Sequence, residues 1–315
     1  MSPPRPPVSV VVPSFNQGRF IRETLESCVA QDHRPLEVIV VDGGSTDETL
    51  SVLRGMKAPE LTWSSEPDRG VVDAVNKGLA RARGDLIAIQ SSDDVLVPGA
   101  ISAAVEALQA DSAAAFAYGD VEHIDATSAV IGADVQGGFD LAEYLGRLMY
   151  VPQPGTVFTR GALNAVGGWR EEFSYAADAD FWLRLAVRFP VVKLRRTVAR
   201  YRYHADQRDT QRAKIGRDWE GAIRDLLASG TLSARERHYA HMGIHLARYR
   251  YAPDHAWRAR TRALYAAVLA NPRALATFRC KRPPISLAYR IPGLRQRRRI
   301  VEFWLDRAAL AGVDS

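Results

Sequence analysis

The chain has 315 residues, of which 47% are hydrophobic and 25% charged, and this globular composition excludes wholesale disorder. Its formal net charge of +6 is concentrated between Trp257 and Val301, a segment rich in Arg that lacks Asp and Glu. No apolar stretch reaches the ~18 residues of a membrane-spanning helix, and Cys28 and Cys280 have no metal-like spacing. The proline-broken amino terminus is unlike a signal peptide. We therefore expect a cytoplasmic protein, with attachment to the inner face of the cell membrane as an alternative.

The first half of the sequence alternates between apolar strands and helical patterns. Strands are predicted at 8–13, 36–42, 61–65 and 85–90, and helices at 20–29, 45–54 and 71–83. The second helix is expected to begin at Ser45, because STDE has the pattern of a capping box that ends at Glu48. Continuous apolar strands separated by helices predict an α/β fold with a parallel sheet covered on both faces.

The second half has a different pattern. Hairpins are predicted at 119–138, a strand at 155–160, an amphipathic helix at 178–189 and an edge strand at 198–204. From about Ala213 onward the pattern is helical. A boundary near residue 205 therefore divides a catalytic domain, 1–205, from a basic helical C-terminal region, 206–315.

Polar residues follow each strand of the predicted parallel sheet. The four segments are PSFN at 13–16, DGGSTD at 42–47, SEPDRG at 65–70 and SSDD at 91–94. Ligands of such sheets bind at the carboxyl ends of the strands. The first segment lacks the glycine-rich dinucleotide fingerprint and the Walker motif. The adjacent Asp93 and Asp94 instead suit Mg²⁺ or Mn²⁺, which binds one or two carboxylates together with substrate phosphates.

Six motifs occur in an order that resembles one family. They are VVVPSFN, VIVVDGGSTDET, SEPDRGVVDAVNKG, GDLIAIQSSDD, GGW followed by AADADFWLRL, and RYRYH. Over about residues 8–204 this order resembles the inverting glycosyltransferases of family 2, which have the GT-A fold. The resemblance implies a Rossmann-like, mostly parallel sheet with helices on both faces, extended by C-terminal helices outside the resemblance.

The resemblance also implies residue roles. The donor-binding residues that it indicates are Pro13, Ser14, Asn16, Asp42, Ser45, Asp68, Arg69, Asn76, Lys77 and Asp93. Asp42 corresponds to the carboxylate that recognises the base, and Asp93 to one that faces ribose or sugar. Asp94 and His204 are expected to bind the metal ion. Ser45 also suits a helix start, and Lys77 a solvated surface position.

The catalytic base is expected in AADADFWLRL. The family usually has Glu-Asp at this point, whereas this chain has Ala177 and Asp178, so the motif is half kept. Asp180 lies four residues before Arg184, a spacing that predicts a surface ion pair. Asp178 is therefore the predicted base. Trp169 is predicted to stack on an acceptor sugar, with a core position as the alternative.

These roles predict a metal-dependent, inverting transfer of a single sugar. The donor is a nucleotide sugar, UDP-sugar by default with GDP and dTDP open, and the acceptor is a hydroxyl of a glycan or lipid-linked molecule. Surface polysaccharide or glycoconjugate biosynthesis is the expected setting. The Gln-x-x-Arg-Trp signature of processive synthases is absent. A sugar nucleotidyltransferase and a non-catalytic nucleotide-sugar-binding module are the alternatives.

The arginine-rich segment near the carboxyl terminus has two interpretations. LRQRRRIVEFWL at 294–305 combines arginines with apolar residues. Such a pattern is typical of an interfacial helix attracted to anionic lipid. The alternative is a helical cap that packs on the acidic catalytic domain. No nucleic-acid-recognition motif accompanies the charge, so nucleic acid is not an expected partner.

Overall fold

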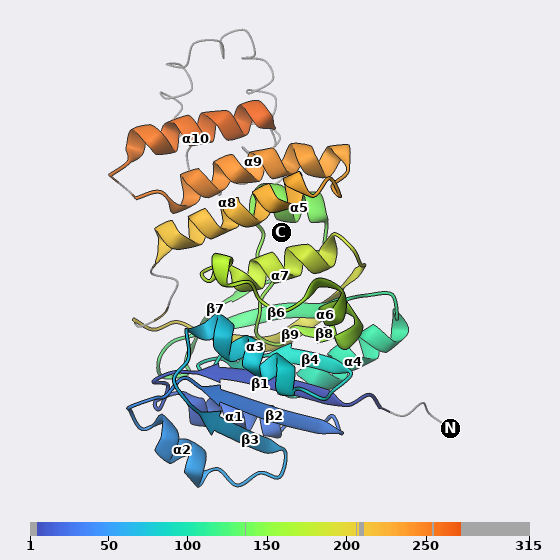
Figure 1. Ribbon diagram of the computed structural model, residues 1–315, viewed down its shortest axis with the longest axis vertical. Helices are drawn as coiled ribbons and strands as arrows, with labels where there is room; N and C mark the ends of the chain where they lie inside the picture. Colours follow the sequence, from blue (N-terminus) through green and yellow to red (C-terminus); the bar gives the residue numbers. More distant parts are fainter. Residues whose placement is uncertain (1–4, 136, 206, 208–210, 254, 272–315) are drawn as a thin grey trace.

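The computed structural model describes residues 5–135, 137–205, 207, 211–253 and 255–271. The arginine-rich segment 294–305 lies outside these residues. A curled mixed sheet forms one end of the molecule, and layers of helices are stacked above it (Figure 1).

Four parallel strands form the first half of the sheet. They are β1 (Val8–Ser14), β2 (Leu36–Asp42), β3 (Leu61–Ser65) and β4 (Leu86–Ile89), in the order β3-β2-β1-β4. Their register places Ser14 beside Asp42 and Asp42 beside Ser65. The predicted parallel sheet is confirmed, and the polar residues that end three of its strands lie next to one another.

Three helices connect these strands, and they are α1 (Ile21–Val29), α2 (Thr49–Gly55) and α3 (Val71–Arg81). Side chains alternate across β1, as in any strand. Val10 and Val12 join the hydrophobic cluster that includes α1, whereas Val11 joins the cluster that includes α3. The predicted start of α2 at Ser45 was wrong, because the Ser45 hydroxyl bonds to Asp42 and to a backbone amide instead of capping a helix.

The second half of the sheet is mixed. Its elements are β5 (Val95–Leu96), α4 (Ala100–Ala110), β6 (Phe116–Ile124), β7 (Val130–Asp134), β8 (Val157–Thr159), α6 (Arg160–Val166), the 3-10 turn η1 (Glu171–Phe173), α7 (Ala177–Ala186) and β9 (Val191–Arg202). The strand order continues β4-β8-β6-β9-β5, and β7 pairs with β6. The predicted edge strand was wrong in position, since β9 lies between β6 and β5. Because β9 lies inside the sheet, Arg202 and His204 at its end lie beside Asp94 and Asp93.

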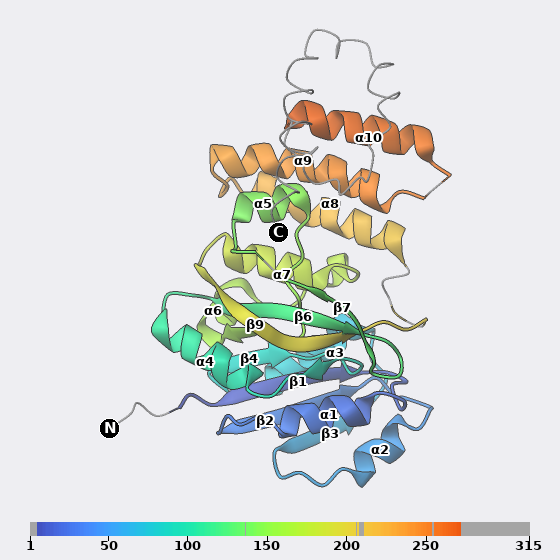
Figure 2. The same ribbon diagram turned by 180° about the vertical axis from the view of Figure 1, so that it is seen from behind.

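Four helices stack on the side of the sheet that α7 covers (Figures 1 and 2). They are α5 (Leu141–Arg147), α8 (Arg212–Ala228), α9 (Ala234–Tyr251) and α10 (Trp257–Ala270). Trp219 and Tyr239 of these helices belong to the same buried cluster as Phe158 and Trp182. The apolar core therefore runs without a break from the sheet into the C-terminal helices. The division at residue 205 stays a prediction.

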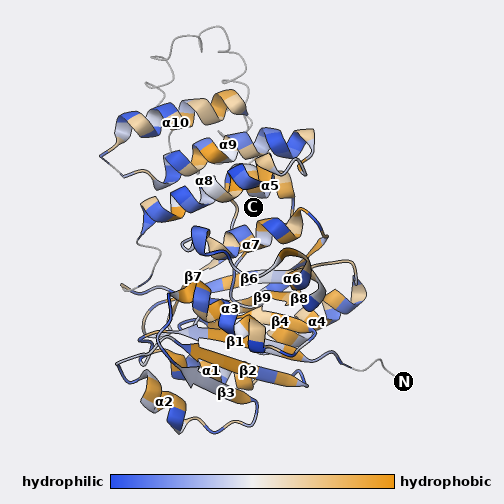
Figure 3. Ribbon diagram, viewed as in Figure 1, coloured by the Kyte–Doolittle hydropathy of each residue, from blue (hydrophilic) through white to orange (hydrophobic). Residues whose placement is uncertain are grey.

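Hydrophobic residues are concentrated in the strands of the sheet, whereas α8 and α10 alternate between hydrophilic and hydrophobic residues (Figure 3). Among the described residues, no helix combines the length and the apolarity needed to cross a membrane.

Gly243 provides a test of the packing between α9 and α5. A Cβ atom at this position would lie 2.1 Å from the carbonyl oxygen of Leu145, so Gly243→Ala must push the two helices apart. We expect this variant to lower the free energy of unfolding by about 1–3 kcal/mol in urea titrations. In the control Gly161→Ala, the added methyl group meets no atom within 4 Å, and helix propensity predicts a gain of up to about 1 kcal/mol. Equal effects would contradict the described packing.

Candidate functional site

Asp42 organises the loop at the end of β2. Its side chain is fully buried. One carboxylate oxygen accepts hydrogen bonds from the amides of Gly44 and Ser45, at 3.1 and 2.9 Å, and from the Ser65 hydroxyl at 2.6 Å. The other accepts from the Ser45 hydroxyl at 2.5 Å. Asp42 thus joins the ends of β2 and β3.

Asn16 joins the loop after β1 to the loop after β2. Its backbone φ of 53° turns the chain, its amide donates to the Ser45 hydroxyl at 2.7 Å, and its side-chain oxygen accepts from the Thr46 amide at 2.9 Å. Nearby, the Asp47 carboxylate accepts the amide of Gly18 at 2.9 Å. Partial burial opposes a low pKa for Asp47, but hydrogen bonds from Thr49 and Gly18 hold that pKa below its usual range.

Pro13, Ser14 and Asp68 lie around the same loops. Pro13 and Ser14 are buried, and the Ser14 hydroxyl has no hydrogen-bond partner among the described residues. The Gly43 amide donates to the Ser14 carbonyl at 2.8 Å. A Cβ atom on Gly43 would lie 2.5 Å from an Asp68 carboxylate oxygen, so the SEPDRG loop touches the β2 loop. The buried hydroxyl is a polar group that a ligand of this edge could satisfy.

Two cations predicted to bind the donor are already paired with acids. Arg69 is 72% exposed and bridges Asp73 at 3.0 Å and Glu171 at 2.7 Å. Lys77 lies 3.2 Å from Glu66 and 3.3 Å from Asp73. The hydrogen bonds that Lys77 donates to Glu66 and then to Asp73 raise the pKa of Lys77, so Lys77 remains charged at neutral pH.

Strand β9 holds the two acids that follow β4. The Arg202 amide donates to the Asp94 carboxylate at 2.8 Å, and His204 Nε2 lies 2.9 Å from Asp93 Oδ2. Asp94 is 1% exposed. The predicted partners Asp93, Asp94 and His204 are therefore brought together by the pairing of β9 with β5, in which Val95 faces Arg200.

Arg202 is a residue of this site that the sequence did not indicate. Its side chain is 1% exposed. The guanidinium donates to the Asp93 carbonyl at 2.6 Å, to the Ser128 hydroxyl at 2.8 Å and to Glu23 at 2.6 Å, and it lies 4.9 Å from the centre of the Phe20 ring. The alternation of RYRYH gave no sign that this arginine is buried. Arg202 therefore connects the loop of Asp93 to α1 and to the loop between β6 and β7.

The donor set beside Asp94 fits a hard divalent cation. His204 Nδ1 is buried without a hydrogen-bond partner among the described residues, while Nε2 faces Asp93. A carboxylate on one ring nitrogen leaves the other available as a ligand. In the described part of the chain, no three His, Cys, Asp or Glu side chains form a cluster that could hold a metal ion. An ion here would therefore need substrate phosphates as further ligands, as Mg²⁺ often does.

Asn76 and Trp169 form a clamp between α3 and the GGW segment. The Asn76 side chain donates to the Trp169 carbonyl at 2.9 Å and accepts its amide at 2.9 Å. Trp169 is 8% exposed and belongs to the core cluster. This is the core position given above as the alternative, and stacking on an acceptor stays a prediction.

Asp178 lies in the first turn of α7 and is partly exposed. Its carboxylate accepts the amide of Ala179 at 2.8 Å, near the positive end of the helix dipole. Burial, with the charge of Asp178 as the next cause, raises the pKa of Tyr144 well above its usual value. The Asp178 side chain is therefore accessible from outside, while its backbone is fixed in the first turn of α7.

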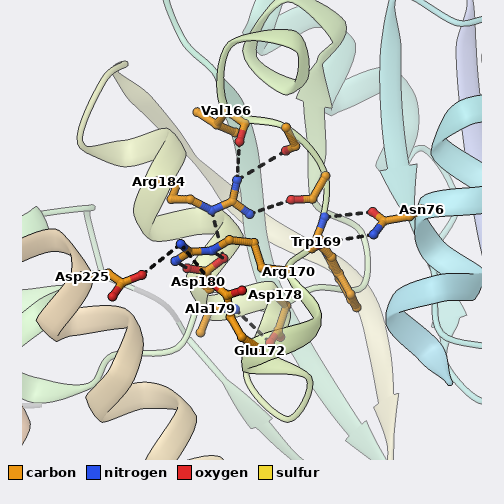
Figure 4. A network of polar contacts seen from close by, with 12 residues as sticks. Asn76, Val166, Trp169, Arg170, Glu172, Asp178, Ala179, Asp180, Arg184 and Asp225 are labelled. Carbon is orange, nitrogen blue, oxygen red and sulfur yellow. Dashed lines mark hydrogen bonds and ion pairs between the residues drawn. The ribbon is translucent and has the colours of Figure 1, made fainter. Parts of the chain in front are cut away.

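Asp180 forms a buried network with two arginines (Figure 4). It is 1% exposed. Arg170 binds it through two nitrogen atoms, and Arg184 Nε lies 2.9 Å from Oδ2. Arg184 also donates to the carbonyls of Val166 and Gly168, at 2.6 and 2.7 Å. The predicted i,i+4 pair is present, but its expected surface position was wrong because Arg170 and the GGW segment cover it.

Comparison with known proteins gives the family. Residues 9–133 match the family model described as glycosyl transferase family 2. The chain is 32% identical to an uncharacterized glycosyltransferase of Mycobacterium tuberculosis. The alignment spans 235 residues, 73% of this chain and 85% of that protein. The chain belongs to glycosyltransferase family 2. It is also 31% identical to chondroitin synthase of Escherichia coli over 183 residues, 58% of this chain and 26% of that larger enzyme.

Solved structures show the same GT-A fold. S. aureus TarS 1-349 in complex with UDP-GlcNAc has a TM-score of 0.62 at 16% identity, over 85% of this chain and 82% of that chain. The mannosyltransferase PcManGT from Pyrobaculum calidifontis, in complex with GDP-Man and Mn²⁺, also has a TM-score of 0.62, at 21% identity over 99% of this chain and 88% of that chain. Because the chain belongs to glycosyltransferase family 2, it is an enzyme of the glycosyltransferase class, and the predicted family and fold class are confirmed.

The Asp180 network predicts a large stability effect. Asp180→Asn leaves Arg170 and Arg184 close together without their shared carboxylate, and we expect a loss of about 3 kcal/mol in the free energy of unfolding. Glu143→Gln breaks a more exposed helical pair with Arg147, at 3.2 Å, and should cost less than about 1 kcal/mol. Urea unfolding of both variants measures the difference. An Asp180 variant as stable as the Glu143 variant would contradict the role given to this network.

Proposed function

We propose that the chain is a metal-dependent, inverting glycosyltransferase that moves one sugar from a nucleotide-sugar donor to an acceptor hydroxyl. The observation that carries this proposal is the meeting of Asp93, Asp94 and His204 at the end of a parallel strand, in a member of glycosyltransferase family 2. TarS and PcManGT, with UDP-GlcNAc and GDP-Man, support a nucleotide-sugar donor. UDP is the default nucleotide, and GDP and dTDP stay candidates.

The nucleoside is assigned to the ends of β1 and β2. The buried Ser14 hydroxyl, which lacks a partner among the described residues, and the neighbouring Asp42 carboxylate support this assignment. Pro13, Asn16 and Ser45 belong to the same loops. A base that bonds to Asp42 would share this carboxylate with the loop hydrogen bonds described above.

The sugar and diphosphate are assigned to the groups around the SEPDRG loop. Asp93 faces ribose or sugar in this proposal, with Asp68 and Arg69 beside it. Arg69 and Lys77 reach phosphate by exchanging their bonds to Asp73, and Arg69 itself is 72% exposed. Asn76 is also assigned to the donor, and its clamp on Trp169 fixes its side chain in place.

Asp178 is assigned as the catalytic base. It takes the proton of an acceptor hydroxyl as the oxygen attacks the anomeric carbon. The bond between that carbon and the nucleoside diphosphate breaks on the opposite face, so the configuration inverts. A single carboxylate is sufficient for this displacement, whereas a double displacement needs a second acid as nucleophile.

Asp94 and His204 would hold Mg²⁺ or Mn²⁺. When bound, such an ion offsets the negative charge that develops on the leaving diphosphate. Arg202 fixes Asp94 from the protein side through its amide.

The acceptor is assigned to the glycans and lipid-linked saccharides of surface polysaccharide or glycoconjugate biosynthesis. A cytoplasmic site, with attachment to an anionic membrane surface through 294–305, remains part of the proposal. That segment lies outside the described residues.

A panel of nucleotide sugars with Mn²⁺ tests this function. The wild-type protein should release nucleoside diphosphate from one donor, and Asp178→Asn should lower this rate by about 10²- to 10⁴-fold, because the base is lost. The variant should keep its thermal stabilisation by the nucleoside diphosphate, since Asp178 is not assigned to the donor. Glu106→Gln, an exposed acid of α4, is the control and should retain the wild-type rate.

The same assay separates the alternatives. A nucleotidyltransferase would release pyrophosphate from a nucleoside triphosphate and a sugar phosphate. A binding module would be stabilised by nucleotide sugars without turnover. Either result, or a fully active Asp178→Asn variant, would contradict the proposed reaction.

A further inference from the structure

One face of α8 lies against the segment that leads into the helix of Asp178. The residues of this face are Lys214, Asp218, Gly221 and Asp225, and their spacing of four, three and four places them on one side of a helix. The segment that they contact is 170–175, which includes η1 and ends just before α7. We call these four residues the α8 contact face.

Two members of the α8 contact face hold Tyr175. The Asp218 carboxylate accepts the Tyr175 amide at 2.7 Å. Lys214 Nζ donates to the Tyr175 hydroxyl at 2.8 Å and lies 4.7 Å from the centre of its ring. Backbone and side chain of Tyr175 are therefore both fixed by α8, three residues before Asp178.

The other two members hold the beginning of the segment. A Cβ atom on Gly221 would lie 2.5 Å from Cε1 of Phe173, so only glycine allows this approach. The Asp225 carboxylate accepts from Arg170 Nη1 at 3.0 Å, and Arg170 also binds the buried Asp180 (Figure 4). The segment is thus fixed at both ends by α8.

The start of α7 has no cap of its own. Ala176 is its N-cap residue and makes no side-chain hydrogen bond to the first turn. Amide groups at such an end need partners from elsewhere. Asp218, which accepts the amide of the preceding residue, supplies a fixed point at the place where a capping side chain is absent.

We propose that the α8 contact face positions the catalytic base, so that Asp218 and Asp225 are positioning residues of the transfer reaction. This inference rests on the proposed function, in which Asp178 is the base. Packing of α8 is supplied by the buried Trp219, Ile223 and Leu226, whereas Lys214, Asp218 and Asp225 of the contact face bind the 170–175 segment. A shift of about 1 Å in a catalytic group can cost up to about 100-fold in rate.

Single variants of the contact face test this inference in the full chain. Asp218→Ala and Asp225→Ala should each lower kcat by about tenfold, because Asp178 loses its fixed place. The KM for the nucleotide sugar should stay within about twofold of wild type, because the donor loops do not touch α8 in this proposal. Asp218→Asn should recover most of the rate, since its side-chain oxygen can still accept the Tyr175 amide.

Glu220→Ala is the matched control on the same helix. Glu220 pairs with Arg248 of α9 and with Arg224, at 2.5 and 2.8 Å, and so points away from the 170–175 segment. Its loss removes an ion pair of α8 without touching the contact face, and kcat should stay at the wild-type value.

The outcomes decide between positioning and general stability. Equal kcat values for Asp218→Ala, Asp225→Ala and Glu220→Ala would overturn the inference, as would a donor KM that rises in step with the loss of kcat. If Asp218→Ala does not fold, the half-exposed Asp225 gives the deciding variant. A wild type that transfers sugar and an inactive Asp178→Asn, together with unaffected contact-face variants, refute this inference alone. A wild type inactive on all donors refutes the proposed function and this inference with it.

Discussion

The pairing of β9 with the two-residue strand β5 is the interaction on which the site depends. Asp93 and Asp94 follow a buried strand, where unpaired negative charge is costly. The paired strand brings the Arg202 amide to Asp94 and the imidazole of His204 to Asp93. These two bonds to the acids come from a backbone amide and an imidazole ring.

Two separately anchored groups of residues surround this pair. Asp42 and Asn16 tie the loops after β1, β2 and β3 to one another, so the donor side is set by strand register. Asp180 and the α8 contact face fix the helix of Asp178 from the other direction. In the proposed function, the first group binds the donor and the second holds the catalytic base. Arg69, which bridges Asp73 and Glu171, is a direct link between them.

Local patterns in the sequence were sufficient for the parallel strands and for the polar loops at their ends. The β-branched residues of β1 and β2 favour strands. The parallel register of these two strands then places Ser14 beside Asp42. The burial of Arg202 and Asp180 could not be predicted, because each depends on partners more than 100 residues away or on a covering segment. Ser45 misled for a related reason, since its hydroxyl donates to Asp42 and accepts the Asn16 amide instead of capping α2.

Crystals of the full chain soaked with Mn²⁺ and the matching nucleoside diphosphate test the central claim most directly. Anomalous scattering from manganese should appear beside Asp94 and Nδ1 of His204, in contact with the diphosphate, while His204 keeps its bond to Asp93. The account is contradicted if the diphosphate binds without an anomalous peak at this place and an arginine or lysine side chain neutralises the Asp94 carboxylate instead.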